Sequence, residues 1–436
     1  MNMVQNAAAG TIRASLRYPA FRRLLSALAV SQVGDWMYNL ALVALVYSRT
    51  HSAAWAGVAT AARVVPIVVL GPLGGAIADR FDRRLIMIVS DIARLALMLL
   101  LALVAAAHLP ILLAPAIAAA ATVAATPYLG CVAATTPQLV DDADLPGANT
   151  ARSAVTAIGI VAGPALGGVL LLVGSPLLAF LTNAVTFGLS ALAVASIPAG
   201  PAFRPVRSQE SQAGFWRGIT AGASALRSQP EALRLVGADI MCSLLYGMQT
   251  VLLLLVARRI GLGADGYGYL FAGIGIGGLA GTAVAGRVIR WQHPRLLLIA
   301  ALAAVGLPMP LLALITWPAA AVVLAAVTGA GAVLVEILTE TGLQRMLDEE
   351  VFGRAYGVAL PASLGGIVVG SLIAPVLVGA FGGPGALIVS GAAVLCYALV
   401  LLRPGRAART QAAARQVAAG QPGVAADGVG DAVMGY

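Results

Sequence analysis

Hydrophobic residues along the chain gather into long runs that are separated by short polar segments. Crossing the roughly 30 Å of hydrocarbon in a bilayer takes about 20 apolar residues of helix. Twelve runs reach this length, near residues 24–47, 54–78, 85–107, 112–134, 153–173, 177–197, 235–257, 267–287, 296–316, 319–341, 358–380 and 385–402. The pattern predicts an all-α polytopic membrane protein with twelve transmembrane helices.

One polar connection, 198–234, is longer than the others and divides the runs into six and six. We expect a cytoplasmic N-terminal segment (1–20), an N-terminal six-helix bundle (21–197), a cytoplasmic central loop (198–234), a C-terminal six-helix bundle (235–402) and a disordered cytoplasmic tail (403–436). The halves also resemble each other in sequence, since residues 74–80 align with 281–287 and residues 159–163 with 366–370 at the same offset of 207. Duplicated halves predict two pseudo-symmetric bundles with a binding site at their interface.

Composition narrows the class of protein further. Only 10% of the residues are charged and 60% are hydrophobic, whereas a soluble domain carries about 25% charged residues. A cytosolic enzyme and a nucleic-acid-binding protein are therefore excluded, and the net charge of +9 needs another explanation.

The explanation lies in the placement of the basic residues, all 27 of which are arginine. With a cytoplasmic N-terminus, 22 of them fall on the cytoplasmic side and 3 outside, namely Arg49, Arg258 and Arg259. Arg63 and Arg94 lie within spans. This bias follows the positive-inside rule and predicts a multi-pass protein of the cell membrane with both termini in the cytoplasm.

A charged sequence lies between the second and third runs: Gly75-Ala-Ile-Ala-Asp79-Arg80-Phe-Asp-Arg83-Arg84. It resembles the signature loop of the major facilitator superfamily, and it departs from that pattern at Asp82, where many members carry glycine. The form Asp-Arg-Phe-Asp-Arg-Arg is similar to a branch that includes the enterobactin exporter and macrolide efflux proteins. The resemblance covers about residues 20–402 and implies the major facilitator fold.

The signature loop is expected to gate transport. Gly74 and Gly75 are small enough for a tight turn between two helices, and Asp79 is an anion that can pair with an arginine or a helix N-terminus. The resemblance implies that Asp79 bridges to the second bundle and steadies the outward-open form. The alternative is that the arginines only fix the topology. Asp91 and Arg94, three residues apart in the third run, are expected to form a local ion pair.

A glycine-rich sequence in the fifth run, Gly163-Pro164-Ala-Leu-Gly167-Gly168, follows Gly159 by one helical turn. It resembles the motif typical of drug:proton antiporters. Glycine and proline allow a helix to kink and to pack closely on a neighbour. Plain helix packing is compatible with this reading.

Ionisable residues inside the spans are the candidates for transport chemistry, because charge at mid-membrane is costly and usually faces a cavity or a partner. Asp35 lies 11 residues into the first run, and Arg63 lies 15 residues from the inner end of the second. We expect comparable depths, which makes an Asp35–Arg63 pair plausible. Burial favours a protonated carboxyl group and a nearby arginine favours an ionised one. Asp35 is therefore the first candidate for proton coupling, with a permanent structural ion pair as the alternative.

Three acids in the second half are further candidates. Glu336 and Glu340 are four residues apart and share one helix face, and Asp239 lies early in the seventh run. Pairing with Arg345 or hydration near the inner end is the alternative for Glu340, and hydration at the interface accounts equally for Asp239.

Aromatic and amide residues beside Asp35 and in the seventh run could line a pocket for an amphipathic ligand: Trp36, Tyr38, Asn39, Tyr246 and Gln249. Packing and interhelical hydrogen bonds are the alternative. The three cysteines, Cys131, Cys242 and Cys396, lie in apolar runs and are expected to be inert core residues.

These observations together predict a secondary active transporter that exports a small amphipathic molecule, such as a drug, an antibiotic or a siderophore-like compound, by alternating access and proton antiport. A proton-independent or uptake permease for a small metabolite is the alternative, and a non-transporting scaffold is a remote one. The expected partners are the substrate, protons and the lipid bilayer. No nucleophile–base or metal constellation is visible, so neither enzyme activity nor a cofactor or metal site is expected. The oligomeric state is open.

Overall fold

The computed structural model describes residues 11–78, 80–173, 175–204, 220, 222–262, 265–288, 294–347 and 349–402, and every regular element in these ranges is helical. The tail expected to be disordered and much of the central loop lie outside the described residues. In chain order the elements are α2 (Ile12–Ser15), α3 (Pro19–Thr50), α4 (Ala53–Ala78), α5 (Arg83–Ala106), α6 (Leu113–Leu139), η1 (Asp142–Asp144), α7 (Leu145–Val173), α8 (Pro176–Ala195), η2 (Pro201–Phe203), α10 (Pro230–Arg259), α11 (Asp265–Val288), α12 (Pro294–Gly306), α13 (Pro308–Leu314), α14 (Pro318–Met346) and α15 (Glu349–Leu402).

Within the described part of the chain, 11 helical stretches are long and apolar enough to cross a membrane. One of them belongs to α15, whose 54 residues would extend roughly 80 Å if straight. Gly382 interrupts this helix with a left-handed φ of 68°. Because a single span needs only about 20 residues, α15 contains two spans that turn at this glycine. The twelve expected spans are therefore present.

Prolines account for several helix boundaries. Pro19, Pro176, Pro230 and Pro318 each stand in the first turn of a helix, where a missing N–H removes no hydrogen bond. Pro308 likewise begins α13 and divides the expected run 296–316 into two helices, α12 and α13. The expected start of the seventh span also shifts, because α10 begins at Pro230 rather than at residue 235.

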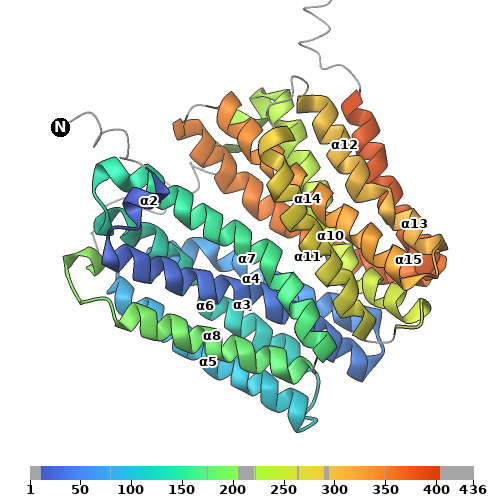
Figure 1. The fold of residues 1–436 in the computed structure, drawn as a ribbon, viewed down its shortest axis with the longest axis horizontal. Helices are drawn as coiled ribbons and strands as arrows, with labels where there is room; N and C mark the ends of the chain where they lie inside the picture. The colour runs from blue at the N-terminus through green and yellow to red at the C-terminus, as the bar shows by residue number, and fades with distance from the viewer. Residues whose placement is uncertain are drawn as a thin grey trace, which may run out of the picture.

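The helices of each half of the chain pack mainly on one another, α3–α8 in the first half and α10–α15 in the second. Figure 1 shows the two groups side by side, blue to green and yellow to red, splaying apart toward the end where the N-terminus lies. Between the halves, α7 packs on α11 and α4 packs on α15. The two helix pairs form the seam of the molecule.

Close contacts across this seam lie toward one end, which we call the distal end because it is opposite the beginning of α3 and the end of α15. There the Arg258 guanidinium donates a hydrogen bond of 2.9 Å to the Tyr47 hydroxyl. A Cβ atom placed on Gly168 would lie 2.3 Å from the carbonyl oxygen of Gly268, so α7 and α11 touch through their backbones. The halves are thus held together at the distal end.

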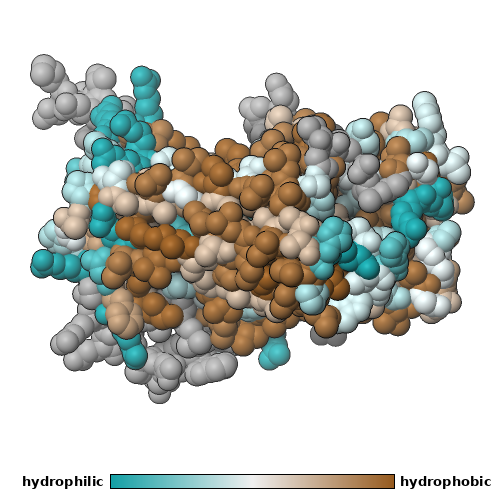
Figure 2. Space-filling model, turned by 90° about the horizontal axis from the view of Figure 1, so that it is seen from below, coloured by the Kyte–Doolittle hydropathy of each residue, from teal (hydrophilic) through white to brown (hydrophobic). Residues whose placement is uncertain are grey.

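The outer surface matches a membrane protein. Exposed apolar side chains follow one face of α5 at Val89, Ile92, Leu99 and Leu103, a spacing of three to seven residues that indicates one helix face. Figure 2 shows hydrophobic side chains over the middle of the face in view, with hydrophilic ones gathered toward its two ends. The apolar middle is the part of the surface that suits lipid.

Candidate functional site

A cavity of about 230 Å³ lies between the two halves. The second half supplies most of its wall, from α10, α11, α14 and the first part of α15. The first half supplies α3 and α7. Its polar lining residues are Trp36, Asp239, Cys242, Ser243, Tyr246, Glu336 and Ser363. A cavity at the interface of two helical bundles is where the substrate site of such a fold is expected.

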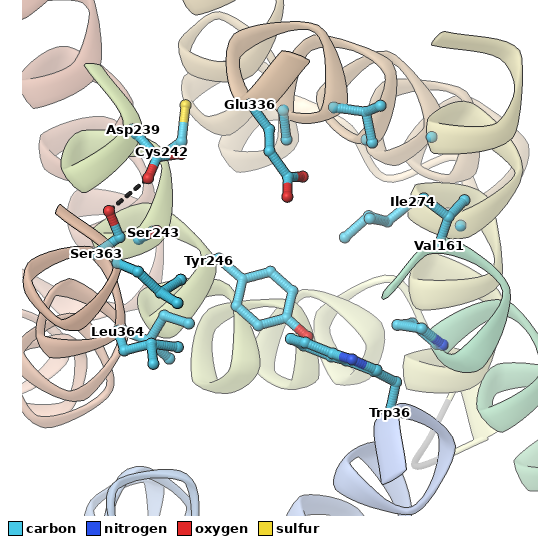
Figure 3. Close-up of a pocket in the computed structure, with 18 residues that line it drawn as sticks. Trp36, Val161, Asp239, Cys242, Ser243, Tyr246, Ile274, Glu336, Ser363 and Leu364 are labelled. Atoms are coloured by element: carbon cyan, nitrogen blue, oxygen red, sulfur yellow. Dashed lines mark hydrogen bonds between the residues drawn. The ribbon is translucent and has the colours of Figure 1, made fainter. Parts of the chain in front are cut away.

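Two carboxylic acids face this cavity, and both come from the second half. Glu336 projects from α14 into the open space, and Asp239 lies on α10 at the adjoining wall (Figure 3). The Ser363 hydroxyl on α15 donates a hydrogen bond to the Asp239 carboxyl group. Within the described part of the chain, neither acid has an arginine partner within ion-pair distance.

Aromatic rings form the opposite side of the cavity. In Figure 3, Trp36 and Tyr246 lie together across the space from Glu336. Their ring centroids are 6.4 Å apart in an edge-to-face arrangement, and Tyr246 stacks in the same way on Phe271. Because Trp36 belongs to α3 and Tyr246 to α10, this contact joins the two halves at the cavity wall.

Asp35 belongs to a different site, inside the first half. Its carboxylate accepts an ion-pair contact of 3.1 Å from Arg94 on α5, and Arg94 also pairs with Asp91. The Ser190 hydroxyl on α8 donates a 2.6 Å hydrogen bond to Asp91. Arg94 is 2% exposed and Asp91 is 0% exposed, whereas the Asp35 side chain is 23% exposed. One guanidinium thus bridges two carboxylates.

Arg63 does not form the plausible ion pair with the Asp35 carboxylate. It donates a 3.1 Å hydrogen bond to the backbone carbonyl oxygen of Asp35 instead. Its guanidinium carbon lies 5.3 Å from the Trp36 ring centroid and 5.4 Å from that of Tyr38, which are cation–π distances. Arg63 therefore lies behind the aromatic wall of the cavity, and Arg94 forms the ion pair with the Asp35 carboxylate.

The other three expected pocket residues lie outside the lining of the cavity. Tyr38, Asn39 and Gln249 are buried among the helices and do not line it. The Gln249 amide, for example, donates to the Met309 sulfur at 3.7 Å. Cys242, which the sequence suggested to be an inert core residue, does line the cavity. Glu340 stays outside it and accepts a hydrogen bond of 3.4 Å from Gln344.

The glycine-rich motif of α7 positions this wall. Gly159, Gly163 and Gly167 face α3, while Gly168 faces α11. A Cβ atom on Gly163 would lie 2.3 Å from the Cβ atom of Trp36, so only glycine allows the two helices to approach this closely. Pro164, the next residue, lines the cavity itself.

The described part of the signature loop makes contacts within the first half. Gly74 and Gly75 do not form the expected turn, because both continue helix α4, which ends at Ala78. Asp82 takes the N-cap position of α5 and accepts a 2.9 Å hydrogen bond from the Leu85 backbone N–H. Asp79, the expected latch, lies outside the described residues.

The loop arginines have separate partners. Arg83 donates to the carbonyl oxygen atoms of Ala78 and Ala134 at 3.1 and 3.0 Å, and it is 4% exposed. Arg84 donates to that of Ile197, just beyond α8, at 2.9 Å. A cation at a helix C-terminus satisfies free carbonyl groups and the helix dipole. Arg80 is exposed.

The fold and the interface cavity are those of a membrane transporter of the major facilitator type. The sequence profile of the transmembrane secretion effector family matches residues 10–425. The chain therefore belongs to this family of the major facilitator superfamily.

Individual relatives agree with this assignment. The chain is 29% identical over 363 residues to BacE of Bacillus subtilis, a proposed bacilysin exporter, covering 81% of this chain and 88% of that one. It is 27% identical over 269 residues to YfiS of Bacillus subtilis, an uncharacterised transporter of the same type, covering 61% of this chain and 63% of YfiS.

Solved structures support the fold alone. The nucleoside transporter NupG aligns with a TM-score of 0.67 at 13% identity over 88% of this chain and 98% of NupG. A bacterial homologue of the lysosomal transporter Spinster, solved in an inward-facing and unoccupied conformation, aligns with a TM-score of 0.62 at 14% identity over 88% of this chain and 95% of that one.

Proposed function

We propose that this protein exports a small amphipathic molecule by alternating access, in exchange for protons that enter the cell. The observation that carries the proposal is the interface cavity, in which Glu336 stands without an ion-pair partner among the described residues opposite the rings of Trp36 and Tyr246. Export is supported by the family, whose description is secretion, and by the proposed exporter BacE.

The cavity acids supply the coupling. An ionised carboxylate in a low-dielectric cavity is costly unless a cation or a proton offsets its charge. A bound substrate with a cationic group offsets it in one state, and a proton offsets it in the other. The two occupants therefore compete for Glu336 and Asp239, which is the requirement for exchange.

This assignment moves the proton site from Asp35 to the second half. The Asp35 carboxylate is held by Arg94 inside the first bundle and does not line the cavity. A carboxylate that already has a buried cationic partner is stabilised in its ionised form, so protonation adds little stability. Asp35, Asp91 and Arg94 are proposed to keep the first bundle rigid while the second moves against it.

The distal contacts support an inward-open conformation. The halves are joined at the distal end by Tyr47–Arg258 and by backbone contact at Gly168. If the termini are cytoplasmic, as the arginine distribution predicts, the structure is closed to the outside and open to the cytoplasm. Substrate would enter from that side.

Transport into membrane vesicles tests direction and coupling together. Everted and right-side-out vesicles that contain the protein are offered radiolabelled alanyl-phenylalanine and, separately, the dye Hoechst 33342. We expect accumulation of at least one probe in everted vesicles with an acidic interior, and its loss when nigericin removes the pH gradient. Accumulation that persists with nigericin, or that occurs only in right-side-out vesicles, would support the proton-independent or uptake alternative.

A further inference from the structure

A charge difference between the two walls of the cavity points to the kind of substrate. The wall from the second half carries the acids Asp239 and Glu336. Behind the opposite wall lies Arg63, 5.3 Å from the centroid of the Trp36 ring. The cavity is thus negative on one side and adjoins a cation on the other.

Arg63 is available for a further anion. Its guanidinium donates to one backbone carbonyl oxygen, that of Asp35, and it has no carboxylate within ion-pair distance among the described residues. It is half-buried, so part of it remains accessible. A guanidinium offers five N–H donors in a planar fork that matches a carboxylate. The hydrogen bond to the Asp35 carbonyl oxygen and the contact with the Tyr38 hydroxyl occupy only part of this fork, so donors remain for an anion.

Tyr246 provides an independent sign of a missing partner at the same wall. Its hydroxyl oxygen is buried, lies beside Asn39, and meets the distance and angle of a hydrogen bond with no group among the described residues, although the ring lines the cavity. A buried polar group without a partner costs free energy that a ligand can recover. Trp36 connects the two groups, since its ring centroid lies 5.3 Å from the Arg63 guanidinium carbon and 6.4 Å from the Tyr246 ring centroid. The two groups could hold one anionic ligand group between them.

We propose that the substrate is a zwitterion with an apolar body, whose cationic end binds Asp239 and Glu336 and whose anionic end binds Arg63 and the Tyr246 hydroxyl. This inference rests on the proposed function and specifies its substrate class. The apolar body lies against Trp36 and the aliphatic lining from Val161, Ile274 and Leu364. A molecule with a charge of only one sign satisfies one wall and leaves the other unpaired.

Three matched probes test the proposal in purified protein in detergent, where no gradient exists. Alanyl-phenylalanine carries both charges, its C-terminal amide carries only the positive one, and its N-acetyl derivative carries only the negative one. Binding is measured as the rise in unfolding temperature with ligand concentration. We expect the zwitterion to bind roughly tenfold more tightly than either derivative, because each lacks one charge-assisted interaction.

Substitutions test which residues bind each charged end of the ligand. Arg63→Gln should remove the preference for the zwitterion over its amide, while Arg63→Lys retains part of it. Glu336→Gln should remove the preference over the N-acetyl derivative. Glu340→Gln is the matched control on the same helix, and it should change neither preference because Glu340 accepts a hydrogen bond from Gln344 outside the cavity and is not one of the proposed ligand contacts.

Equal binding of the zwitterion and its amide to the unaltered protein would overturn the proposal, as would the absence of binding by all three probes. A preference for the amide would identify a monocation site and would leave proton-coupled export standing. Conversely, a clear preference for the zwitterion combined with transport that does not depend on the pH gradient would contradict only the proposed proton coupling.

Discussion

The Tyr47 hydroxyl accepts a 2.9 Å hydrogen bond from the Arg258 guanidinium, and the same guanidinium carbon lies 5.6 Å from the Tyr47 ring centroid. Tyr47 belongs to α3 and Arg258 to α10, so the contact crosses between the halves at the distal end. It exists only while that end is closed. Such a contact sets the balance between the two conformations without touching the cavity.

Arg258→Gln should therefore shift the population toward the form that is open at the distal end. Losing a charge-assisted hydrogen bond of about 1.5 kcal/mol corresponds to a roughly tenfold shift. A reporter cysteine in the cavity, Val333→Cys, should react faster with a membrane-impermeant maleimide added to intact cells.

The neighbouring Arg259 is a matched control. It donates to the carbonyl oxygen atoms of Leu312 and Ile315 within the second half, and among the described residues it has no hydrogen bond or ion pair across the seam. Arg259→Gln should leave the labelling rate of the reporter unchanged. Equal acceleration by both variants would show that the Tyr47–Arg258 contact does not hold the distal end closed.

The cluster around Arg94 predicts an unequal pair of stability effects. Arg94→Gln leaves Asp91 and Asp35 without their shared cation, and loss of one partner from a buried ion pair costs about 3–5 kcal/mol. Asp35→Asn should cost only about 1 kcal/mol, because the amide oxygen can still accept a hydrogen bond from Arg94. Thermal unfolding in detergent measures both. A loss on Asp35→Asn as large as that on Arg94→Gln would contradict the bridging role of Arg94.

The approach of α7 to α3 makes a prediction about glycine. Gly163→Ala places a methyl group 2.3 Å from the Trp36 Cβ atom, and overpacking of this kind costs about 1–3 kcal/mol. Gly357→Ala in α15 is the control, since no atom lies within 4 Å of its would-be Cβ atom. It should stabilise the helix by about 0.5–1 kcal/mol. If Gly163→Ala is as stable as Gly357→Ala, the close packing behind Trp36 is not required.

Much of the fold could be predicted from the sequence, because the bilayer sets both the length of the apolar runs and the side on which the arginines lie, and both can be read along the chain. The break in α15 was predicted, since Gly382 falls between the expected runs 358–380 and 385–402. The division of the expected run 296–316 at Pro308 was not predicted. The turn at the signature loop was misplaced, because Gly74 and Gly75 satisfy a helix as well as a turn.

The partner of Asp35 was missed even though the sequence held a signal for it. Counted from the inner ends of the expected spans, Asp35 is 11 residues deep, Arg94 is 9 and Arg63 is 15. Depth in the membrane alone therefore favours Arg94 over Arg63 as the partner of Asp35. The residues that line the cavity were harder to predict, because the periodicity of a span does not reveal which face of its helix meets the other half of the molecule. Tyr38 and Asn39 turn into the bundle while Trp36, their near neighbour, turns to the cavity.

The central claim is that Glu336 exchanges its proton for the substrate, and proton-driven accumulation in proteoliposomes tests it most directly. One proton exchanged for one zwitterion moves one charge, so 100 mV can sustain a roughly 50-fold gradient of the substrate, from about 2.3 kcal/mol per charge. Alanyl-phenylalanine uptake is compared between the unaltered protein, Glu336→Gln and the control Glu340→Gln. The account predicts that Glu336→Gln lowers the accumulation ratio to about one while Glu340→Gln retains it. Undiminished accumulation by Glu336→Gln would contradict the account.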